Sequence, residues 1–191
     1  LAAHGVSEVV DENMANAARV HAVENGEDLS DYTMIAFGGA APLHASRMCE
    51  KLGINTFLIP EGAGVGSAIG FLYAPFSFEA TRTYYTKLSN FNAAVTQKIF
   101  NGLECEAIQF VKSCEPNAHI TSEFKAYMRY KGQGWEIPVT LSKKNALLPT
   151  AKVLKKLFET EYRKVFGRSV DGIDIEVTMW SVNSFTPLKK I

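Results

Sequence analysis

The residues best suited to hold a ligand are two consecutive glycines, Gly38 and Gly39, which follow an apolar run and precede Ala40. Because glycine has no Cβ, a ligand can lie directly on the backbone at such a turn. Pro42 suits the first turn of a following helix, whose unpaired N–H groups would favour a phosphate or another anion. A tight strand-to-helix turn without a ligand explains the same residues, since Gly-Gly turns are common.

Two polar side chains could contact a ligand at this turn. His44 comes about one helical turn after Gly39 and could donate a hydrogen bond to a phosphate or a substrate, although a lone helical histidine more often has a structural role. Asn13, on the preceding predicted helix, offers both a donor and an acceptor to a base edge. Arg19 on that helix is explained equally well by a solvated polar face.

A second glycine cluster at residues 62–70 is similar to a dinucleotide-binding fingerprint but lacks its spacing. The glycines follow a G-x-G-x-G pattern, and no acidic residue ends a following parallel strand about 20 residues further on. We interpret this cluster as a helix packed so closely that only small residues fit, and we assign no cofactor to it.

The predicted elements fall into two groups, residues 1–75 and 76–191. In the first group, helices at 7–25, 42–52 and 65–73 alternate with short strands at 33–37 and 55–59, with Ser7 as a candidate cap and Gly26 and Gly53 as helix ends. That order is typical of an α/β layer fold. After Pro75 the predicted elements become longer and more polar, which predicts a domain boundary there.

The second group is predicted to be an α+β domain. Its expected elements are an extended segment at 78–88, helices at 92–114 and 150–166, strands at 124–131 and 135–141 around a turn, and a last strand at 173–179. The order β-α-β-β-α-β is that of the ferredoxin-like arrangement, and we expect both helices on one face of the sheet. Trp135 should alternate inward with the return strand, and Glu176 should point outward with other carboxylates.

The turn between the hairpin strands, Gly132-Gln133-Gly134, has two interpretations. The simpler one is the tip of a hairpin. In the other, Arg129 and Gln133 face a ligand cleft or a partner subunit.

Composition excludes several classes of protein. The 191 residues carry 20 basic and 20 acidic side chains, so no overall field attracts nucleic acid or an anionic membrane. No apolar run approaches the roughly 20 residues of a membrane span, and no signal-peptide pattern is present. Three cysteines match neither a zinc site nor a disulfide framework, which predicts free thiols and a cytoplasmic protein. The four histidines form no metal-binding pair. The start at Leu1 predicts an internal fragment.

Several blocks of sequence, in the right order, resemble the C-terminal portion of hydantoinase A-type proteins. This is the family of N-methylhydantoinase, ATP-dependent oxoprolinase, and the acetone and acetophenone carboxylases. The blocks lie at residues 10–21, 24–26, 36–45, 60–70, 128–134 and 166–168. The resemblance therefore runs nearly end to end, with Ala41 standing where the family block usually has a glycine.

The resemblance implies an actin-like (ribonuclease H-like) ATPase, in which two lobes close on a nucleotide. Residues 1–75 would be the C-terminal part of the second lobe, its adenosine side, and 76–191 the α+β C-terminal domain. The nucleotide-binding residues would be Gly38, Gly39, Ala40, Asn13 and His44. ATP and Mg²⁺ are the implied cofactors, and the metal ligands and catalytic residues are expected outside this chain.

The activity that the resemblance implies is ATP-dependent hydrolysis of a cyclic amide, of the hydantoinase or oxoprolinase type. Phosphoryl transfer would activate the amide oxygen, and water would then open the ring. The implied partners are ATP, a small cyclic amide and a second, hydantoinase B-type subunit or domain, with no nucleic acid and no membrane. Two alternatives stay open: a fragment of an ATP-dependent ketone carboxylase subunit, and a non-catalytic subunit-assembly module.

Overall fold

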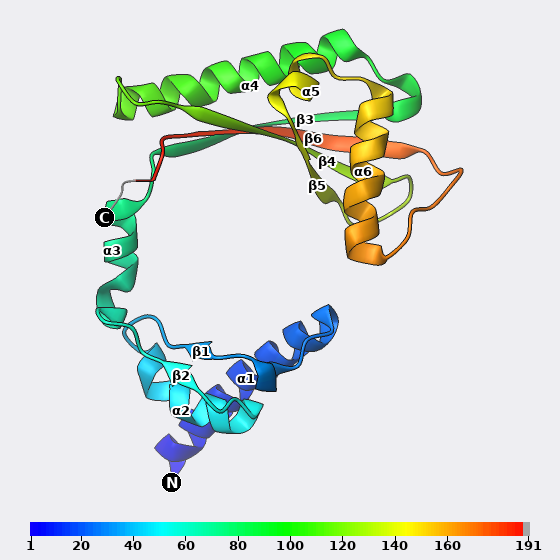
Figure 1. Ribbon diagram of the computed structural model, residues 1–191. Coiled ribbons are helices and arrows are strands. Elements are labelled where there is room, and N and C mark those ends of the chain that lie inside the picture. Colours follow the sequence, from blue (N-terminus) through cyan, green and yellow to red (C-terminus); the bar gives the residue numbers. More distant parts are fainter. Residues whose placement is uncertain (189–191) are drawn as a thin grey trace. The chain divides into compact units, whose positions relative to one another are not determined.

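The computed structural model describes residues 1–188, and the chain divides into two compact units, Leu1–Tyr73 and Ala74–Ile191. Figure 1 labels the helices and strands of both units.

The first unit contains three helices and two short strands. In chain order they are α1 (Ala2–Asn25), β1 (Met34–Ile35), α2 (Ala41–Leu52), β2 (Phe57–Leu58) and α3 (Gly66–Tyr73). The predicted alternation of helix and strand is confirmed. Because α1 begins at Ala2, Ser7 lies inside the helix and does not cap it. Gly26 and Gly53 end α1 and α2 in the left-handed conformation, with φ of 71° and 70°.

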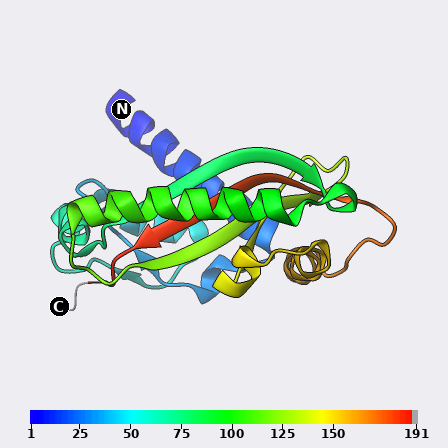
Figure 2. The ribbon, with the colours of Figure 1, turned by 90° about the horizontal axis from the view of Figure 1, so that it is seen from above.

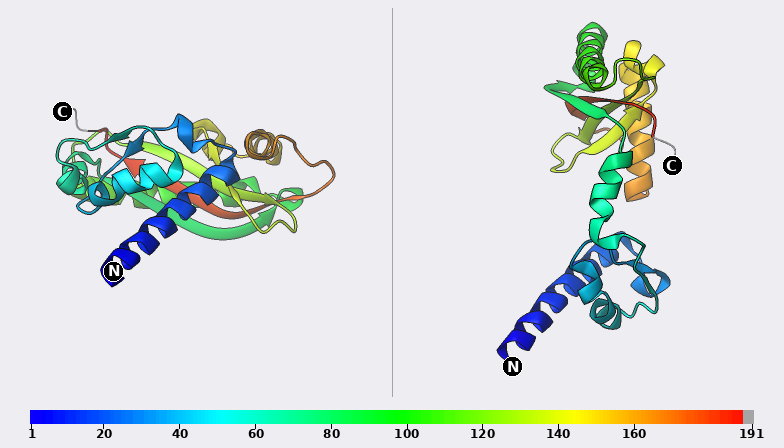
Figure 3. Two further views of the ribbon diagram at one scale, coloured as in Figure 1. Left: turned by 90° about the horizontal axis from the view of Figure 1, so that it is seen from below. Right: turned by 90° about the vertical axis from the view of Figure 1, so that its left-hand side faces the viewer.

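Helices α1 and α2 lie side by side (Figure 3). Ion pairs between their side chains join them. Arg47 of α2 donates from Nε and Nη2 to the two carboxylate oxygens of Glu8, at 3.0 Å each. Lys51 Nζ lies 3.2 Å from Glu8 and 2.9 Å from Glu12. Two carboxylates of α1 therefore face two cations of α2, and the small residue Ala15 is fully buried on α1.

Strands β1 and β2 are parallel neighbours, with Met34 opposite Phe57 and Ile35 opposite Leu58. The carboxyl ends of parallel strands lie at the same edge of a sheet, which is where open α/β sheets bind ligands. Both glycine-rich segments follow these carboxyl ends directly, so the sheet brings them together.

The second unit is a four-stranded antiparallel sheet with helices on one face. Its elements are β3 (Ser77–Lys87), α4 (Ala93–Cys114), β4 (Thr121–Tyr130), β5 (Ile137–Leu141), α5 (Lys143–Leu147), α6 (Ala151–Phe166) and β6 (Ile175–Phe185). Apart from the short α5, this is the predicted order of elements. Figure 2 shows α4 lying along the strands.

The order of strands across the sheet differs from the ferredoxin-like arrangement. It is β3-β6-β4-β5, so the second and fourth strands of the domain are central, whereas a ferredoxin-like sheet has its first and third strands in the centre. The last strand enters between β3 and β4 and pairs antiparallel with both. Element order alone does not specify such long-range pairing, which explains why the sequence-based expectation was wrong on this point.

The core lies on one face of the sheet. Along β4 the residues Phe124, Ala126, Met128 and Tyr130 are buried, as their alternation predicts. Phe100 of α4 packs edge-on against Phe124, with ring centroids 5.6 Å apart, and Phe158 of α6 packs edge-on against Tyr130 at 4.9 Å. Because Phe124 and Tyr130 are an even number of residues apart on one strand, α4 and α6 cover the same face, as expected.

One expectation about side-chain direction was wrong. Trp135 is 75% exposed because the regular strand begins only at Ile137. In β6 a bulge shifts the register near Thr178, so the inward residues change from Ile175 and Val177 to Trp180 and Val182.

Candidate functional site

The loops that follow β1 and β2 contact each other at the carboxyl edge of the parallel pair. The backbone N–H of Gly38 donates to the carbonyl of Ala63 at 3.0 Å. The ring of Phe37 packs directly on the α-carbon of Gly66, where a Cβ would collide with it. The expected close packing of the second glycine cluster is therefore found at Gly66. It is wrong for Gly64 and Gly70, where an added Cβ would meet no heavy atom within 4 Å among residues 1–188, beyond the adjacent residues and the helix's own backbone.

The first glycine loop borders open space. An added Cβ at Gly38 or at Gly39 would meet no heavy atom within 4 Å among residues 1–188, beyond the adjacent residues of the chain. Gly38 has a φ of 114°, which strains any other residue type, whereas Gly39 has an ordinary φ. A ligand could thus approach the backbone here, and only Gly38 is required by the backbone conformation.

The loop leads into the uncapped N-terminus of α2. Ala40 is the N-cap and has no side chain that could accept a hydrogen bond from the first turn. Ala41 is the first residue of the helix, and no residue other than glycine has a positive φ in the described part of the chain. The methyl group that replaces the family's glycine is therefore compatible with this backbone, and the positive end of the helix dipole stays available to an anion.

His44, in the first turn of α2, is tied to α1. Its Nδ1 lies 2.6 Å from Oδ1 of Asp11, a contact between residues 33 positions apart in the chain. Asp11 is only 4% exposed, whereas the side chain of His44 is 29% exposed. Sequence reasoning missed Asp11. The helical periodicity of α1 could have indicated its burial, because Asp11 lies on the same inward side as the buried Ala15 and Ala22.

Asn13 is not brought together with His44 by the fold. It is exposed and lies two positions beyond the inward-facing Asp11, about 200° around the helix axis. Arg19 has a structural role, because it donates to Glu12 and to the backbone carbonyl of Lys51 near the end of α2, at 2.9 Å each.

Arg129 and Gln133 also lie apart from each other. Arg129 is on the sheet face opposite the helices, where its Nε donates to Glu176 at 3.2 Å. Glu176 lies on that outward face, as predicted, but it is only 5% exposed, and its carboxylate also accepts a hydrogen bond from Tyr85 at 2.7 Å. Gln133 holds the hairpin turn, since its side chain contacts the N–H of Tyr130 and the hydroxyl of Tyr162, both at 3.3 Å.

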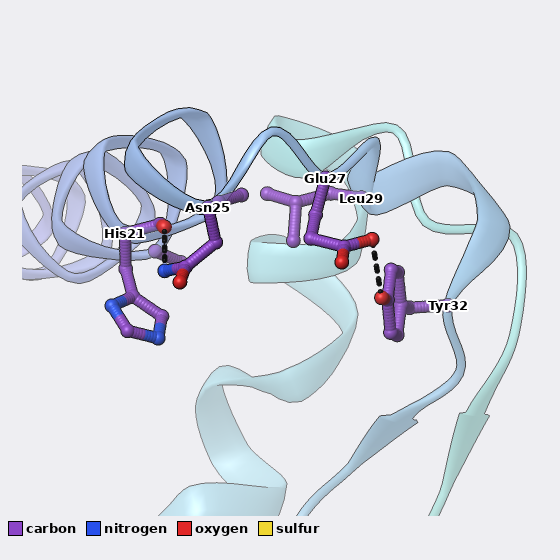
Figure 4. A pocket seen from close by; sticks show the side chains of 7 residues that line it. His21, Asn25, Glu27, Leu29 and Tyr32 are labelled. Atoms are coloured by element: carbon purple, nitrogen blue, oxygen red, sulfur yellow. Dashed lines mark hydrogen bonds between the residues drawn. The ribbon is translucent and has the colours of Figure 1, made fainter. Parts of the chain in front are cut away.

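A separate pocket of about 390 Å³ lies at the C-terminal end of α1 (Figure 4). Its lining comprises Ala18, His21, Ala22, Asn25, Glu27, Leu29 and Tyr32. The Tyr32 hydroxyl donates to Glu27 at 2.7 Å, and Asn25 donates to the carbonyl of His21 at 2.8 Å, so two of its polar groups are already paired. None of the site residues predicted from the sequence lines this pocket.

The described residues contain no cluster of three metal-binding side chains and no helix suited to span a membrane. Among residues 1–188, no three His, Cys, Asp or Glu side chains gather closely enough to hold a metal ion by themselves. In the same part of the chain, no helix has the length and apolar character required to cross a bilayer.

The chain matches one family model and is similar to several known proteins. The sequence model described as Hydantoinase/oxoprolinase matches residues 1–80. An uncharacterised protein of Methanocaldococcus jannaschii is 32% identical over 161 residues, which cover 84% of this chain and 23% of that protein. The caprolactamase subunit alpha of Pseudomonas jessenii is 25% identical over 183 residues, covering 92% of this chain and 26% of the relative.

Solved structures share the fold. The ATP-dependent caprolactamase of Pseudomonas jessenii superposes with a TM-score of 0.70 and 22% identity, over 99% of this chain and 28% of that one. Nucleotide-free acetone carboxylase gives a TM-score of 0.67 and 21% identity, over 96% of this chain and 28% of that one. The chain thus spans about a quarter of the length of these relatives. It belongs to the hydantoinase/oxoprolinase family and corresponds to a C-terminal portion of its members.

Proposed function

We propose that this chain is the adenosine-side portion of an ATP-dependent enzyme that hydrolyses a cyclic amide. Residues 1–75 would form the end of the second lobe of an actin-like ATPase, and 76–191 would form an α+β domain that follows it. The proposal draws on the family assignment and on a relative named caprolactamase, since a caprolactam is a cyclic amide.

The observation that carries the proposal is the first glycine loop. Gly38 and Gly39 leave open space against the backbone at the carboxyl edge of a parallel strand pair, and the uncapped α2 begins at once. Backbone that is accessible beside a helix N-terminus is suited to a nucleotide. In the proposed site Gly38, Gly39 and Ala40 contact the nucleotide, with His44 one turn further on.

This chain's own contribution would be binding and orientation. ATP would supply the phosphoryl group that activates the amide oxygen. The side chains that hold Mg²⁺ and the triphosphate are proposed to lie in other parts of the protein, since this chain spans about a quarter of the length of its relatives. A second subunit or domain of the hydantoinase B type is the proposed partner, consistent with a relative that is named as a subunit.

The test is an activity assay of a longer polypeptide that contains this chain, with and without a partner subunit. Phosphate release and ring opening are measured with ATP plus caprolactam, a hydantoin or 5-oxoproline, and with ATP plus acetone and bicarbonate. Amide-dependent phosphate release supports the proposal. Turnover with acetone alone would favour a ketone carboxylase, which the likeness to acetone carboxylase makes the second candidate. No ATP turnover with any substrate would favour a non-catalytic assembly module.

A further inference from the structure

The contact between Asp11 and His44 specifies which imidazole nitrogen is free to meet a ligand. A carboxylate can only accept hydrogen bonds, so the 2.6 Å contact places a proton on Nδ1 of His44. Asp11 is 4% exposed, and in the described part of the chain His44 is the only residue whose side chain hydrogen-bonds to its carboxylate. A buried carboxylate requires such a donor, which gives the pairing its strength.

The other nitrogen, Nε2, is open to solvent. Among residues 1–188, the only buried side-chain N or O atom without a hydrogen-bond partner is Oγ1 of Thr96. Nε2 of His44 has no hydrogen-bond partner in that part of the chain and is not such an atom, and the His44 side chain is 29% exposed. His44 is the fourth residue after the N-cap Ala40, on the order of 6 Å along the helix axis. His44 thus belongs to the part of α2 that follows the glycine loop most closely in the chain.

We propose that Asp11 is a positioning residue that keeps the proton of the neutral His44 ring on Nδ1, so that Nε2 accepts a hydrogen bond from a hydroxyl group of the ligand. The identity of that ligand rests on the proposed function: a nucleotide presents its ribose hydroxyls as donors. An acceptor nitrogen does not favour a phosphate, whose oxygens are themselves acceptors at neutral pH. His44 therefore contacts the ribose of the adenosine, and the triphosphate is held by other parts of the protein.

The tautomer can be measured without any ligand. Nitrogen-15 NMR of the histidine-labelled chain at pH 8, above the ordinary range of imidazole titration, distinguishes a protonated from an unprotonated ring nitrogen. His44→Asn identifies the signals of His44 by their loss. We expect a protonated Nδ1 and an unprotonated Nε2. In Asp11→Asn, whose amide can donate to Nδ1, the population should move toward the form protonated on Nε2.

Glu24→Gln is the matched control, because Glu24 is an exposed carboxylate on the same helix. It should leave the His44 signals unchanged. Protonation of Nε2 in the unaltered chain, or identical His44 signals in Asp11→Asn, would overturn the positioning role of Asp11.

The ligand is tested separately, in the longer polypeptide, by titration with ATP, 2′-deoxy-ATP and 3′-deoxy-ATP. His44→Asn can keep the bond to Asp11 but lacks an atom at Nε2, and it should weaken ATP binding about 3- to 10-fold. It should leave the affinity for one of the deoxy analogues unchanged. His44→Gln, whose amide oxygen can reach the Nε2 position, should restore part of the ATP affinity.

The outcomes separate the two proposals. Equal weakening for ATP and both analogues in His44→Asn would overturn the hydroxyl contact. If the unaltered protein binds no ATP, the proposed function fails and the ribose contact fails with it, while the NMR result still decides whether Asp11 sets the tautomer.

Discussion

The ring of Phe37 occupies the place beside Gly66 that a side chain would need, so the two glycine-rich segments are in direct contact. Phe37 immediately precedes Gly38, whose N–H is bonded to Ala63 in the other segment. The shape of the first glycine loop therefore depends on a glycine almost thirty positions further along the chain.

Two glycines of α3 should respond to alanine in opposite ways. Gly66→Ala pushes the new methyl into the ring of Phe37, which is 52% exposed and can turn away, so it should lower the free energy of unfolding by no more than about 1 kcal/mol. Gly70→Ala meets open space in the same helix and should raise it by up to about 1 kcal/mol, because alanine is the better helix former. Urea unfolding followed by circular dichroism measures both, and equal effects would contradict the packing role of Gly66.

Gly39→Val should weaken ligand binding without destabilising the fold. Gly39 has an ordinary φ and open space around it, so Gly39→Val should change the free energy of unfolding by less than about 1 kcal/mol. In the longer polypeptide it should weaken ATP binding at least tenfold, because the branched side chain fills the space proposed for the nucleotide. Calorimetry provides the affinity.

Gly38→Ala is the contrasting variant for that experiment. Its positive φ should make it destabilising by about 1–2 kcal/mol before any ligand is added. Unchanged ATP affinity in a stably folded Gly39→Val protein would remove the loop from the nucleotide site.

The ion pairs between α1 and α2 should make the first unit sensitive to acid. Hydrogen bonds from Arg47 and Lys51 lower the pKa of Glu8 to about 2, from an ordinary value of 4.5, and Lys51 and Arg19 lower the pKa of Glu12. A carboxylate with a depressed pKa stabilises the fold fully above its unfolded-state pKa and loses that contribution as the pH falls through the folded-state value. Stability should therefore decline between about pH 5 and pH 2.

The measurement is the thermal midpoint of the first unit as a function of pH, compared with Glu8→Gln. The variant should start lower at pH 7 and show a shallower decline, since it has one fewer carboxylate to protonate. Salt should reduce the difference, because these side chains are partly exposed. Parallel pH profiles for the two proteins would show that the Glu8 pairs do not contribute.

Arg129 should stabilise the second unit through its ion pair with Glu176. Arg129→Met leaves a nearly buried carboxylate with a hydrogen bond from Tyr85 but without its cation, and should cost about 1–3 kcal/mol. Arg82→Met, on strand β3, which pairs with the strand of Glu176, removes an exposed arginine and serves as the control. Adding Glu176→Gln to Arg129→Met should recover part of the loss. Strict additivity of the two substitutions would exclude the coupling.

The tyrosine provides an independent readout of the same carboxylate. The hydrogen bond to Glu176 raises the pKa of Tyr85, because ionisation would place two negative charges side by side. Glu176→Gln should therefore lower that pKa toward the ordinary tyrosine value, as followed by ultraviolet absorbance, with Tyr85→Phe identifying the transition. An unchanged titration would contradict the pairing.

The 191-residue chain alone should neither hydrolyse ATP nor bind it tightly. In the proposed two-lobed enzyme the contacts to Mg²⁺ and the triphosphate belong to other parts of the protein. Losing three charge-assisted contacts of about 1.5–3 kcal/mol each moves a micromolar site to the millimolar range or beyond. A micromolar dissociation constant by calorimetry, or steady phosphate release, would place the triphosphate site within these residues.

Local patterns predicted the elements well where the signal lies within a few residues. The ends of α1 and α2 at Gly26 and Gly53 follow from the preference of glycine for positive φ. The alternation along β4 predicted which of its side chains enter the core. The first-unit strands proved much shorter than their apolar runs, as β1 and β2 contain two residues each.

The sequence by itself determined where helices stop, which residues of β4 are buried, and where a glycine loop opens beside a helix N-terminus, because each depends on neighbours in the chain. Only the tertiary structure placed β6 between β3 and β4, paired Asp11 with His44, and buried Glu176 against Arg129. The residues in these pairs are 33 and 47 positions apart. Such contacts form when whole faces pack, so their partners are chosen by the geometry of the assembled layers and leave no mark in a local pattern.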